Sequence, residues 1–375
     1  MLKIAILGDF IQTPEFDIDK ALLKILQGTD FNIANLEAPF IHDNSHPSNG
    51  RSGLYQKISN CDLLKKLNIK IVSLANNHIS DFGLEGFQYT KELLKENDIL
   101  YFGAGEDQTE AEAPVVYEFN GMKISVRGAM SRYLTRFHAG EDRFGTADIN
   151  AKKISEALKQ DHSDIKIVYN HWNQEYEDFP EPIYKEDAEG IIDYADLIAG
   201  SHSHCIQGIE EVNKKPIFYS LGNFSLPNID YYQCRISPYR SKSYHSFFPL
   251  ITFSETGVSY EIIPYVLNPN GSILSTPSKE SQETIREQIK IISIPLNLKQ
   301  GEYLKFYMKH RDRKMRKPLT RNHKRNSMNL KGYRLKYKVV HGIESGSAKI
   351  LDKLGLRKLI RKRFAAVIDK IQKAK

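Results

Sequence analysis

Short apolar stretches rich in Ile and Val recur along residues 1–200, and each ends where polar residues begin. Such stretches fit strands that are buried on both faces, although periodicity alone does not separate them from a buried helical turn. Their short length favours strands. We therefore predict strands over residues 2–7, 31–34, 69–75, 165–169 and 197–199.

Apolar residues at helical spacing fill the stretches between these strands. The predicted helices cover residues 19–27, 62–67, 83–97, 149–160 and 185–194. Strands that alternate with helices predict a largely parallel sheet covered by helices. Residues 117–126, 217–221 and 250–264 resemble hairpin strands that would form a second layer. The predicted class is therefore α/β with a mixed sheet.

The α/β pattern ends near residue 268, where Pro, Gly, Ser and Thr become frequent. A chain of 375 residues can bury a large core. We predict an α/β domain over residues 1–268, a linker or final strand region over residues 269–300, and a basic, mainly helical extension over residues 301–375. Residues 285–298 fit either a last strand of the domain or the start of the extension.

The net charge of +7 conceals a strong asymmetry between the body and the end of the chain. Residues 301–375 contain 24 Lys and Arg against 5 Asp and Glu, a net charge of +19, which leaves −12 for residues 1–300. Residues 354–371 place apolar side chains at helical spacing between Lys and Arg, which predicts a basic amphipathic helix.

Three partners stay open for this helix. They are the protein's own acidic body, an anionic membrane surface and an acidic polymer. Nucleic acid is the least favoured partner, because no stacking platform or recognised nucleic-acid-binding motif accompanies the charge.

The cysteine and hydropathy patterns bear on the compartment. Three cysteines without paired spacing give no disulfide framework, which favours a reducing compartment. Met1 leads directly into the first strand without the features of a signal peptide. No stretch approaches the roughly 20 apolar residues that cross a bilayer. We therefore expect a cytoplasmic protein, with attachment to the inner face of the membrane through residues 354–371 as one alternative.

Side chains that bind metals follow the predicted strands. The phrases are Asn35-Leu36-Glu37, Asn76-Asn77-His78, His171-Trp172 and Ser201-His202-Ser203-His204. Because open α/β sheets gather ligands at the carboxyl ends of their strands, we expect these phrases to meet at one edge of a sheet. Imidazoles, carboxylates and amide oxygens are the donors that borderline divalent metals choose. The sequence therefore predicts a hydrolase-like metal pocket.

His202 and His204 are separated by one residue, directly after a strand and a glycine. Both rings can face one pocket only if the chain turns between them, or else each ring serves a different metal. The spacing is therefore more typical of two metals than of one. Two histidines at this spacing are, on their own, as readily explained as polar loop residues.

Several longer phrases resemble the CapA family of bacterial capsule and poly-γ-glutamate synthesis proteins. They run from about Lys3 to about Pro264 in the family's order and include residues 31–37, 72–78, 200–204 and 219–224. The resemblance implies a calcineurin-like metallophosphoesterase fold, a sandwich of mixed β-sheets flanked by helices, to which this chain adds the basic helical C-terminal extension. Fold membership does not by itself fix the reaction.

The resemblance implies a set of metal ligands when it is carried over residue by residue. The six implied ligands are Asp9, Glu37, Asn77, His171, His202 and His204. Glu37 takes the position of the bridging carboxylate. His171 and His202 complete one metal site, and His204 joins Asp9 and Glu37 at the other. The implied cofactor is one or two divalent ions, with Mn, Fe or Zn the expected metals.

His78, beside the implied asparagine ligand, is the expected catalytic residue, because an imidazole can protonate a leaving group near neutral pH. Further residues in the same phrases are expected to contact substrate or to support the ligands. These residues are Asn35, Asn76, Glu175, Gln207 and Asn223. The alternative for each is an ordinary turn or loop hydrogen bond.

The first motif departs from that of general metallophosphoesterases. They carry Asp-x-His, whereas Asp9 is followed here by Phe10 and Ile11, so a mononuclear or degenerate pocket stays open.

Two functions follow from the resemblance. The first is a CapA-like metal-dependent hydrolase of a phosphoester or related bond in capsule, exopolysaccharide or poly-γ-glutamate biosynthesis. The second is a non-catalytic scaffold or polymer-binding subunit of a capsule-synthesis complex. The expected partners are an anionic polymer or phosphoester substrate and capsule-synthesis proteins.

Overall fold

The computed structural model describes residues 1–316 apart from 49, 51–52, 135–136, 228–229, 232–233 and 236–243. The chain divides into two compact units, Met1–Leu298 and Lys299–Lys375. The first unit contains every predicted site residue. The amphipathic helix predicted for residues 354–371 lies outside the described residues, so its membrane and polymer partners stay predictions.

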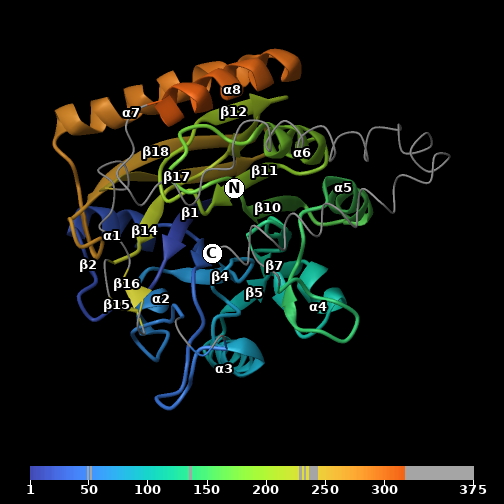
Figure 1. Cartoon of the computed structure of the whole chain (residues 1–375), viewed down its shortest axis with the longest axis vertical. Helices are drawn as coiled ribbons and strands as arrows, with labels where there is room; N and C mark the ends of the chain where they lie inside the picture. The colour runs from blue at the N-terminus through green and yellow to red at the C-terminus, as the bar shows by residue number, and fades with distance from the viewer. Residues whose placement is uncertain are drawn as a thin grey trace. The chain divides into compact units, whose positions relative to one another are not determined.

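A nine-stranded mixed sheet forms one layer of the first unit (Figure 1). Strand β14 (Asn223–Ser225) pairs with β1 off the main path. The main path runs through β2 (Asp17–Ile18), β19 (Ile273–Ser275), β18 (Gly257–Leu267), β17 (His245–Ser254), β1 (Leu2–Phe10), β3 (Phe31–Leu36), β4 (Ile69–Ser73) and β5 (Leu100–Phe102). Strands β1, β3, β4 and β5 are parallel, whereas β17 and β18 form an antiparallel hairpin beside β1.

A six-stranded sheet forms the second layer. Its order is β12 (Ile209–Val212), β13 (Lys215–Phe218), β11 (Leu197–Ser201), β10 (Ile165–His171), β8 (Met122–Arg127) and β7 (Val115–Phe119). The four inner strands are parallel and the two edge strands are antiparallel to their neighbours. Two short pairs complete the strands, β6 (Ala104–Gly105) with β9 (Gly145–Thr146) and β15 (Asp230–Tyr231) with β16 (Cys234–Arg235).

Large side chains join the two sheets. The Tyr169 hydroxyl of β10 donates a hydrogen bond of 2.8 Å to the Leu7 carbonyl of β1. The rings of Phe31 and Tyr117 meet edge to face at 4.9 Å, which joins β3 to β7. Both contacts involve residues far apart in the sequence, and buried aromatic pairs add packing energy beyond the area they cover.

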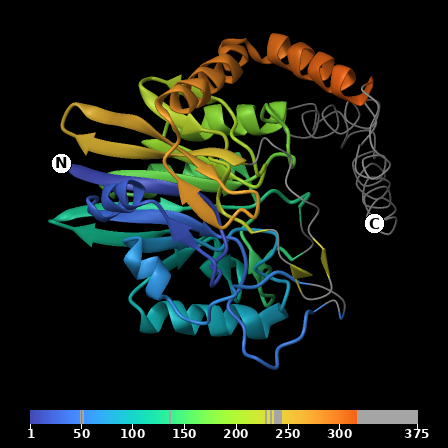
Figure 2. The same ribbon diagram turned by 90° about the vertical axis from the view of Figure 1, so that its left-hand side faces the viewer.

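The described residues also form helices in both units. They are α1 (Lys20–Gln27), α2 (Asp62–Lys66), α3 (Gly83–Glu96), α4 (Gln108–Glu112), α5 (Ala151–Gln160), α6 (Pro182–Ile192) and α7 (Lys279–Ser293), followed by the 3₁₀ turn η2 (Ile294–Asn297) and, in the second unit, α8 (Gln300–Arg316). Leu26 of α1, Leu64 of α2 and Leu94 of α3 share one core with the nine-stranded sheet. Helix α6 packs on β11 and β13. Figure 2 shows α3 and α6 on opposite sides of the strands. The predicted α/β sandwich of mixed sheets flanked by helices is confirmed.

The structure differs from the prediction in how the strands are distributed between the two sheets. The parallel strands were expected in one sheet and the hairpins in a second layer. Instead, each sheet combines parallel strands with antiparallel hairpins, since β7–β8 and β12–β13 join one sheet and β17–β18 the other. Hydrophobic periodicity indicates how deeply a strand is buried, but it does not indicate which other strand it pairs with.

The strand alternative for residues 285–298 is wrong, because α7 and η2 occupy this region. Ser278 begins α7 by accepting a hydrogen bond of 3.2 Å from the Ser281 amide. Ile285, Ile289 and Ile292 then fall on one buried face, as the helical repeat requires.

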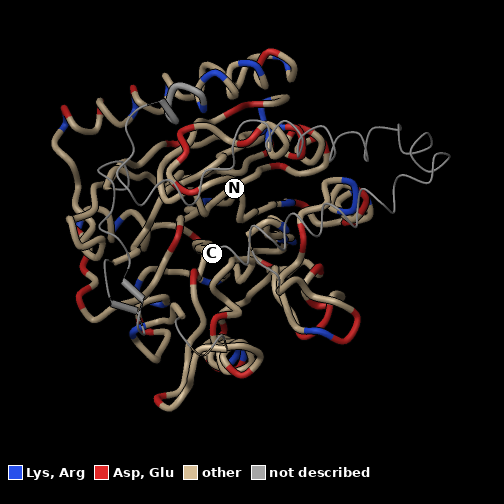
Figure 3. Tube along the Cα trace, viewed as in Figure 1, with Lys and Arg blue, Asp and Glu red and all other residues tan. Residues whose placement is uncertain are grey.

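Acidic positions are distributed over several loops and helices in the view of Figure 3. Asp9 and Glu37 are different, because both carboxylates are completely buried. The buried carboxylates are therefore the charged groups whose placement most needs an explanation.

No described helix is both long enough and apolar enough to cross a membrane.

Candidate metal centre

Polar side chains from both sheets meet where the parallel strands end. Asp9 lies near the end of β1, and Glu37 directly follows β3. His171 is the last residue of β10, and His202 and His204 follow β11. Their exposed fractions run from 0% to 7%. Five potential metal ligands from distant stretches of sequence are thus buried at one edge of the sandwich.

The pairing of β14 with β1 places Asn223 beside Asp9. A Cβ atom on Gly8 would lie 1.9 Å from the Gly222 carbonyl oxygen, so only glycine allows this close approach. The Tyr265 hydroxyl donates to the Asn223 carbonyl at 2.7 Å and fixes the strand. The Asn223 side-chain oxygen consequently lies 2.9 Å from His204 Nδ1.

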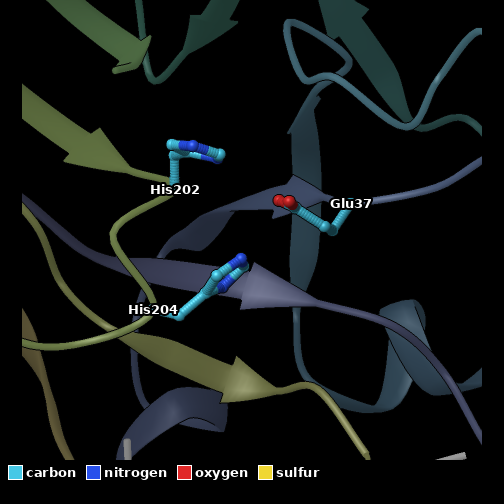
Figure 4. Close-up of side chains that lie close together, drawn as sticks. All are labelled: Glu37, His202 and His204. Atoms are coloured by element: carbon cyan, nitrogen blue, oxygen red, sulfur yellow. The ribbon is translucent and has the colours of Figure 1, made fainter. Parts of the chain in front are cut away.

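Glu37, His202 and His204 form the first donor group (Figure 4). One ligand atom from each lies within 4.8 Å of the others, and the three side chains point toward a common centre. Glu37 Oε1 and His202 Nδ1 are buried and have no hydrogen-bond partner among the described residues. A buried polar atom left unpaired costs about 1–3 kcal/mol, a cost that a bound cation would remove. One carboxylate and two imidazoles suit Zn²⁺, Fe²⁺ or Mn²⁺.

The backbone turns at both histidines of this group. His202 has a φ of 86° and His204 a φ of 51°, in the left-handed region that residues with a Cβ rarely adopt. Such strain costs on the order of 1–3 kcal/mol per residue and persists where the surroundings impose it. The turn brings both rings to one centre. The expectation that each histidine serves a different metal stays a prediction.

Asp9 and Asn223 hold the His204 ring from one side. His204 Nδ1 is 3.1 Å from Asp9 Oδ2, and the Asp9 carboxylate also accepts the His202 backbone N–H at 3.2 Å. A carboxylate that accepts from Nδ1–H leaves Nε2 as the free ligand atom, an arrangement common around protein metals. Asp9 therefore orients the two histidines of the first donor group.

Asp9, Glu37 and His171 form the second donor group, and its ligand atoms also lie within 4.8 Å of one another. Glu37 belongs to both groups, the position that the family resemblance gives to the bridging carboxylate. The partition of the other donors differs from the expected one, in which His171 accompanied His202. Here the Asn35 amide nitrogen also lies within hydrogen-bonding distance of both carboxylates, 2.8 Å from Asp9 Oδ1 and close to Glu37 Oε2.

His171 has a protein partner at each ring nitrogen. Its Nε2 lies 2.8 Å from Asn77 Oδ1, and its Nδ1 lies 2.9 Å from the Ser201 hydroxyl. Because the amide oxygen of Asn77 can only accept, Nε2 has the proton and Nδ1 accepts from Ser201. Asn77 then donates to His78 Nε2 at 3.0 Å, and His78 Nδ1 lies 2.9 Å from Asp81 Oδ2. The contacts form a continuous hydrogen-bonded chain.

Burial is the largest single influence on the pKa values of the ionisable groups in this centre. It raises the pKa of Glu37 well above its ordinary value, and the nearby Asp9 carboxylate adds to this rise. It lowers the pKa of His202 to about 4 and the pKa of His171 well below its usual range. Burial also acts to raise the pKa of Asp9 and to lower that of His204, but the hydrogen bond between the two and the charge interactions around them together outweigh it in both cases. A divalent cation would favour the ionised carboxylate and neutral imidazoles.

His78 and Asn76 lie at the border of the centre. The His78 side chain is 26% exposed, which makes it the most accessible imidazole of this chain of contacts. Asn76 is buried, and its side-chain oxygen accepts the backbone N–H groups of His78 and Ile79 at 3.1 Å and 2.9 Å. This is the turn-forming role that an asparagine after a strand commonly has.

The two remaining predicted residues come from loops after β10 and β11. Gln207 is buried and donates to the Glu177 carbonyl at 3.0 Å, while its oxygen accepts from Asn173 at 3.1 Å. It therefore supports the loop that contains Glu175. Glu175 itself is exposed, and its charge acts to raise the pKa values of His202 and His204 against the larger effect of burial on each.

Sequence reasoning assigned no role to Ser201 or Asp81, which contact His171 and His78. Ser201 stands next to His202, and Asp81 follows His78 by three residues, and that proximity was the available signal. The missing histidine of the first motif has a clear structural counterpart. Ile11 is completely buried in a small apolar cluster with Ala38 and Leu54 and offers no ligand.

Comparison with known proteins identifies relatives of this chain. The family model described as "Bacterial capsule synthesis protein PGA_cap" matches residues 10–227. Capsule biosynthesis protein CapA of Bacillus anthracis is 30% identical over 209 residues, covering 53% of this chain and 51% of that protein. PGA biosynthesis protein CapA of Bacillus subtilis is 31% identical over 207 residues, covering 53% of this chain and 54% of that protein. The chain thus spans about half the length of these curated relatives.

Among solved structures, the NAD nucleotidase of Haemophilus influenzae aligns with a TM-score of 0.42 and 16% identity, over 83% of this chain and 67% of that one.

Proposed function

This chain belongs to the PGA_cap family of bacterial capsule synthesis proteins, and from that premise we propose that it is a metal-dependent hydrolase of a phosphoester or related bond in capsule, exopolysaccharide or poly-γ-glutamate biosynthesis. The names of the two Bacillus relatives support the biosynthetic part of the proposal. The single observation that carries the hydrolytic part is the first donor group, whose buried Glu37 and His202 keep unpaired donor atoms.

Glu37, His202 and His204 would hold the cation, which would supply Lewis acidity toward an oxygen of the scissile bond. The surrounding residues have defined tasks. Asp9 holds the ring of His204, and the left-handed backbone at residues 202 and 204 turns both imidazoles to the same side. These contacts fix the ligands before any substrate arrives, which is what a preorganised site requires.

His78 is the residue we assign to proton transfer. Asp81 holds its Nδ1 at 2.9 Å, which fixes the ring and leaves Nε2 facing Asn77. The ring is partly exposed and belongs to the hydrogen-bonded chain that leads to His171. Once a proton from solvent is bound at Nε2, in place of the hydrogen bond from Asn77, the ring would give that proton to a departing oxygen of the substrate and return to its neutral form.

A second candidate function is a non-catalytic scaffold of a capsule-synthesis complex. The observation in its favour is that Ile11 occupies the position of the missing histidine ligand and is buried among apolar side chains. A site that has lost a ligand can keep its fold without its reaction, since fold and function separate readily.

Metal content measured together with hydrolysis tests the proposal. The purified protein is incubated with Mn²⁺, dialysed, analysed for metal and assayed with a chromogenic phosphodiester. We expect bound metal and hydrolysis in the native protein and loss of both in His202→Ala. His162→Ala removes an exposed histidine and is the matched control, with no expected change. Bound metal without hydrolysis would favour the scaffold, and absence of metal would exclude the proposed hydrolase.

A further inference from the structure

We propose that this chain holds one cation rather than a pair, because the side-chain amide of Asn35 takes the place of a second ion. The inference rests on the proposed metal-dependent function and specifies how many ions that function uses. Its basis is the contrast between the two donor groups that share Glu37. In the first, His202 Nδ1 has no hydrogen-bond partner among the described residues, whereas in the second, hydrogen bonds within the protein engage both nitrogens of His171 and oxygens of both carboxylates.

The orientation of the Asn35 amide follows from its neighbours. Asn76 Oδ1 accepts two backbone N–H groups, so Asn76 Nδ2 must face the other way. There it donates to the Leu36 carbonyl at 2.7 Å and to Asn35 Oδ1 at 3.3 Å. With its oxygen so engaged, Asn35 has only its NH₂ group to direct at the carboxylates. The backbone thus determines the orientation through two successive amides.

The Asn35 NH₂ group fits the space between the two acids. It donates one hydrogen bond to Asp9 Oδ1 at 2.8 Å and the other to Glu37 Oε2, and its nitrogen lies 3.4 Å from His171 Nδ1. It therefore contacts every member of the second donor group. An N–H donor between two carboxylates satisfies their oxygens as a cation would, although it supplies no full charge.

Of the other atoms of the second donor group, Glu37 Oε1 has no hydrogen bond among the described residues and lies 3.6 Å from His171 Nε2, and the rest are engaged. Asp9 Oδ2 is occupied by His204 and by the His202 backbone N–H, and both nitrogens of His171 have protein partners. A second ion would have to displace the Asn35 amide and break the hydrogen bond from His171 to Asn77.

The first donor group needs no such rearrangement. Glu37 Oε1 and His202 Nδ1 are buried without hydrogen-bond partners among the described residues, Glu37 Oε1 lies 3.6 Å from His171 Nε2, and the contacts of His204 Nδ1 leave its Nε2 for a metal. Three protein ligands with a remaining position for water or substrate are typical of mononuclear catalytic sites. The burial of Ile11 agrees, because no histidine is present to complete a second site.

Metal stoichiometry of two Asn35 variants tests the inference. The full chain is titrated with Mn²⁺ by calorimetry, and the bound ions are examined by electron paramagnetic resonance. We expect one ion per native chain with the signal of isolated Mn²⁺. Asn35→Asp replaces the NH₂ group by a carboxylate of the same shape, and Asn35→Ala removes the amide without adding charge. We expect both variants to bind a second ion, close enough to the first, about 3.5–4 Å, for the two spins to couple.

Asn60→Asp is the matched control, because it adds the same charge at an exposed position and can still accept the Asp62 amide hydrogen bond. It should bind one ion. Two coupled ions in the native chain would overturn the inference and leave the proposed hydrolase intact. A single ion in both Asn35 variants would overturn the role of Asn35. A native chain that binds no ion would overturn the proposed metal-dependent function itself.

Discussion

Two buried polar clusters of this protein differ in whether their carboxylate is fully paired with other side chains. In the first donor group, the carboxylate of Glu37 has one oxygen without a hydrogen-bond partner among the described residues. In the second cluster, which we call the closed cluster, Lys185 Nζ lies 2.7 Å from Glu210 Oε1 and 2.5 Å from Glu189, and the Tyr219 hydroxyl donates to Glu210 Oε2 at 2.7 Å. Both oxygens of Glu210 are therefore paired within the protein.

The contrast shows how a buried carboxylate can be recognised as structural or as a cation ligand. Burial raises the pKa of Glu210, but the contacts with Lys185 and Tyr219 oppose the rise. Burial and the Asp9 carboxylate both raise the pKa of Glu37, and the hydrogen bond that opposes this rise comes from the uncharged amide of Asn35. A buried charge needs a partner. The protein supplies that partner in the closed cluster, and we infer that a metal supplies it in the first donor group.

The largest expected effect is on the closed cluster. Lys185→Met leaves Glu210 buried without its cation, and breaking a buried pair in this way costs about 3–5 kcal/mol. We expect a loss of this size in the free energy of unfolding, measured by urea denaturation. Glu189→Gln is the control, since the Glu189 side chain is 41% exposed and its pairing should contribute less than about 1 kcal/mol. Equal effects of the two variants would contradict the distinction between the clusters.

The opposite result is expected for Glu37→Gln in the absence of metal. No protein cation is lost, so the metal-free protein should unfold at nearly the native urea concentration. With Mn²⁺ at a hundred times its dissociation constant, the native protein should gain about 2.7 kcal/mol, and Glu37→Gln should lose this gain. Urea denaturation with and without Mn²⁺ measures both quantities. A large loss of metal-free stability in Glu37→Gln would show that Glu37 is structural.

The two clusters can also be disturbed through the strand between them. A Cβ atom on Gly200 would lie 2.3 Å from Trp172 Nε1 and 2.4 Å from the Tyr219 carbonyl oxygen, atoms that are themselves hydrogen bonded. We expect Gly200→Ala to cost about 1–3 kcal/mol through overpacking and to change the fluorescence of the only tryptophan. Gly190→Ala is the control, because nothing lies within 4 Å of its Cβ position in α6. It should stabilise the protein by about 0.5–1 kcal/mol.

The smallest expected effect concerns pH. The pKa of His204 is raised by its contact with Asp9, so protonation stabilises the metal-free protein below the unfolded pKa, and this contribution is lost as pH rises through the folded value. Metal binding has the opposite dependence, because a ligating imidazole must be neutral. The Mn²⁺-induced rise in melting temperature should therefore grow between about pH 6 and about pH 8. The corresponding change is about 1.4 kcal/mol per pH unit for each proton released. A constant rise across this range would contradict the assignment of His204 as a ligand.

The sequence was sufficient for much of the fold, because local signals determine local structure. Asp19 and Asn150 cap α1 and α5 at the places where the helical patterns begin, and each of the five helices predicted between residues 19 and 194 is present. The predicted CapA family is confirmed by the family match. The assignment of each strand to a sheet was not predictable, since it depends on contacts such as that between Tyr169 and Leu7.

The grouping of the site residues was also beyond the sequence. His202 and His204 share one centre because of their left-handed backbone, which the surrounding fold imposes. The role of Asn35 depends on which way its amide points, and Asn76 determines that through hydrogen bonds. Lys185 and Glu210 gave no signal at all, because charged residues at such positions are usually exposed.

In the first donor group, Glu37 follows β3 of the nine-stranded sheet, and both histidines follow β11 of the six-stranded sheet. Neither sheet alone can assemble it, and His204 is synthesised long after Glu37 leaves the ribosome. A nascent chain therefore has no complete site with which to capture metal. We expect the metal to bind late in folding. A bound ion would then indicate that the two sheets have packed together correctly.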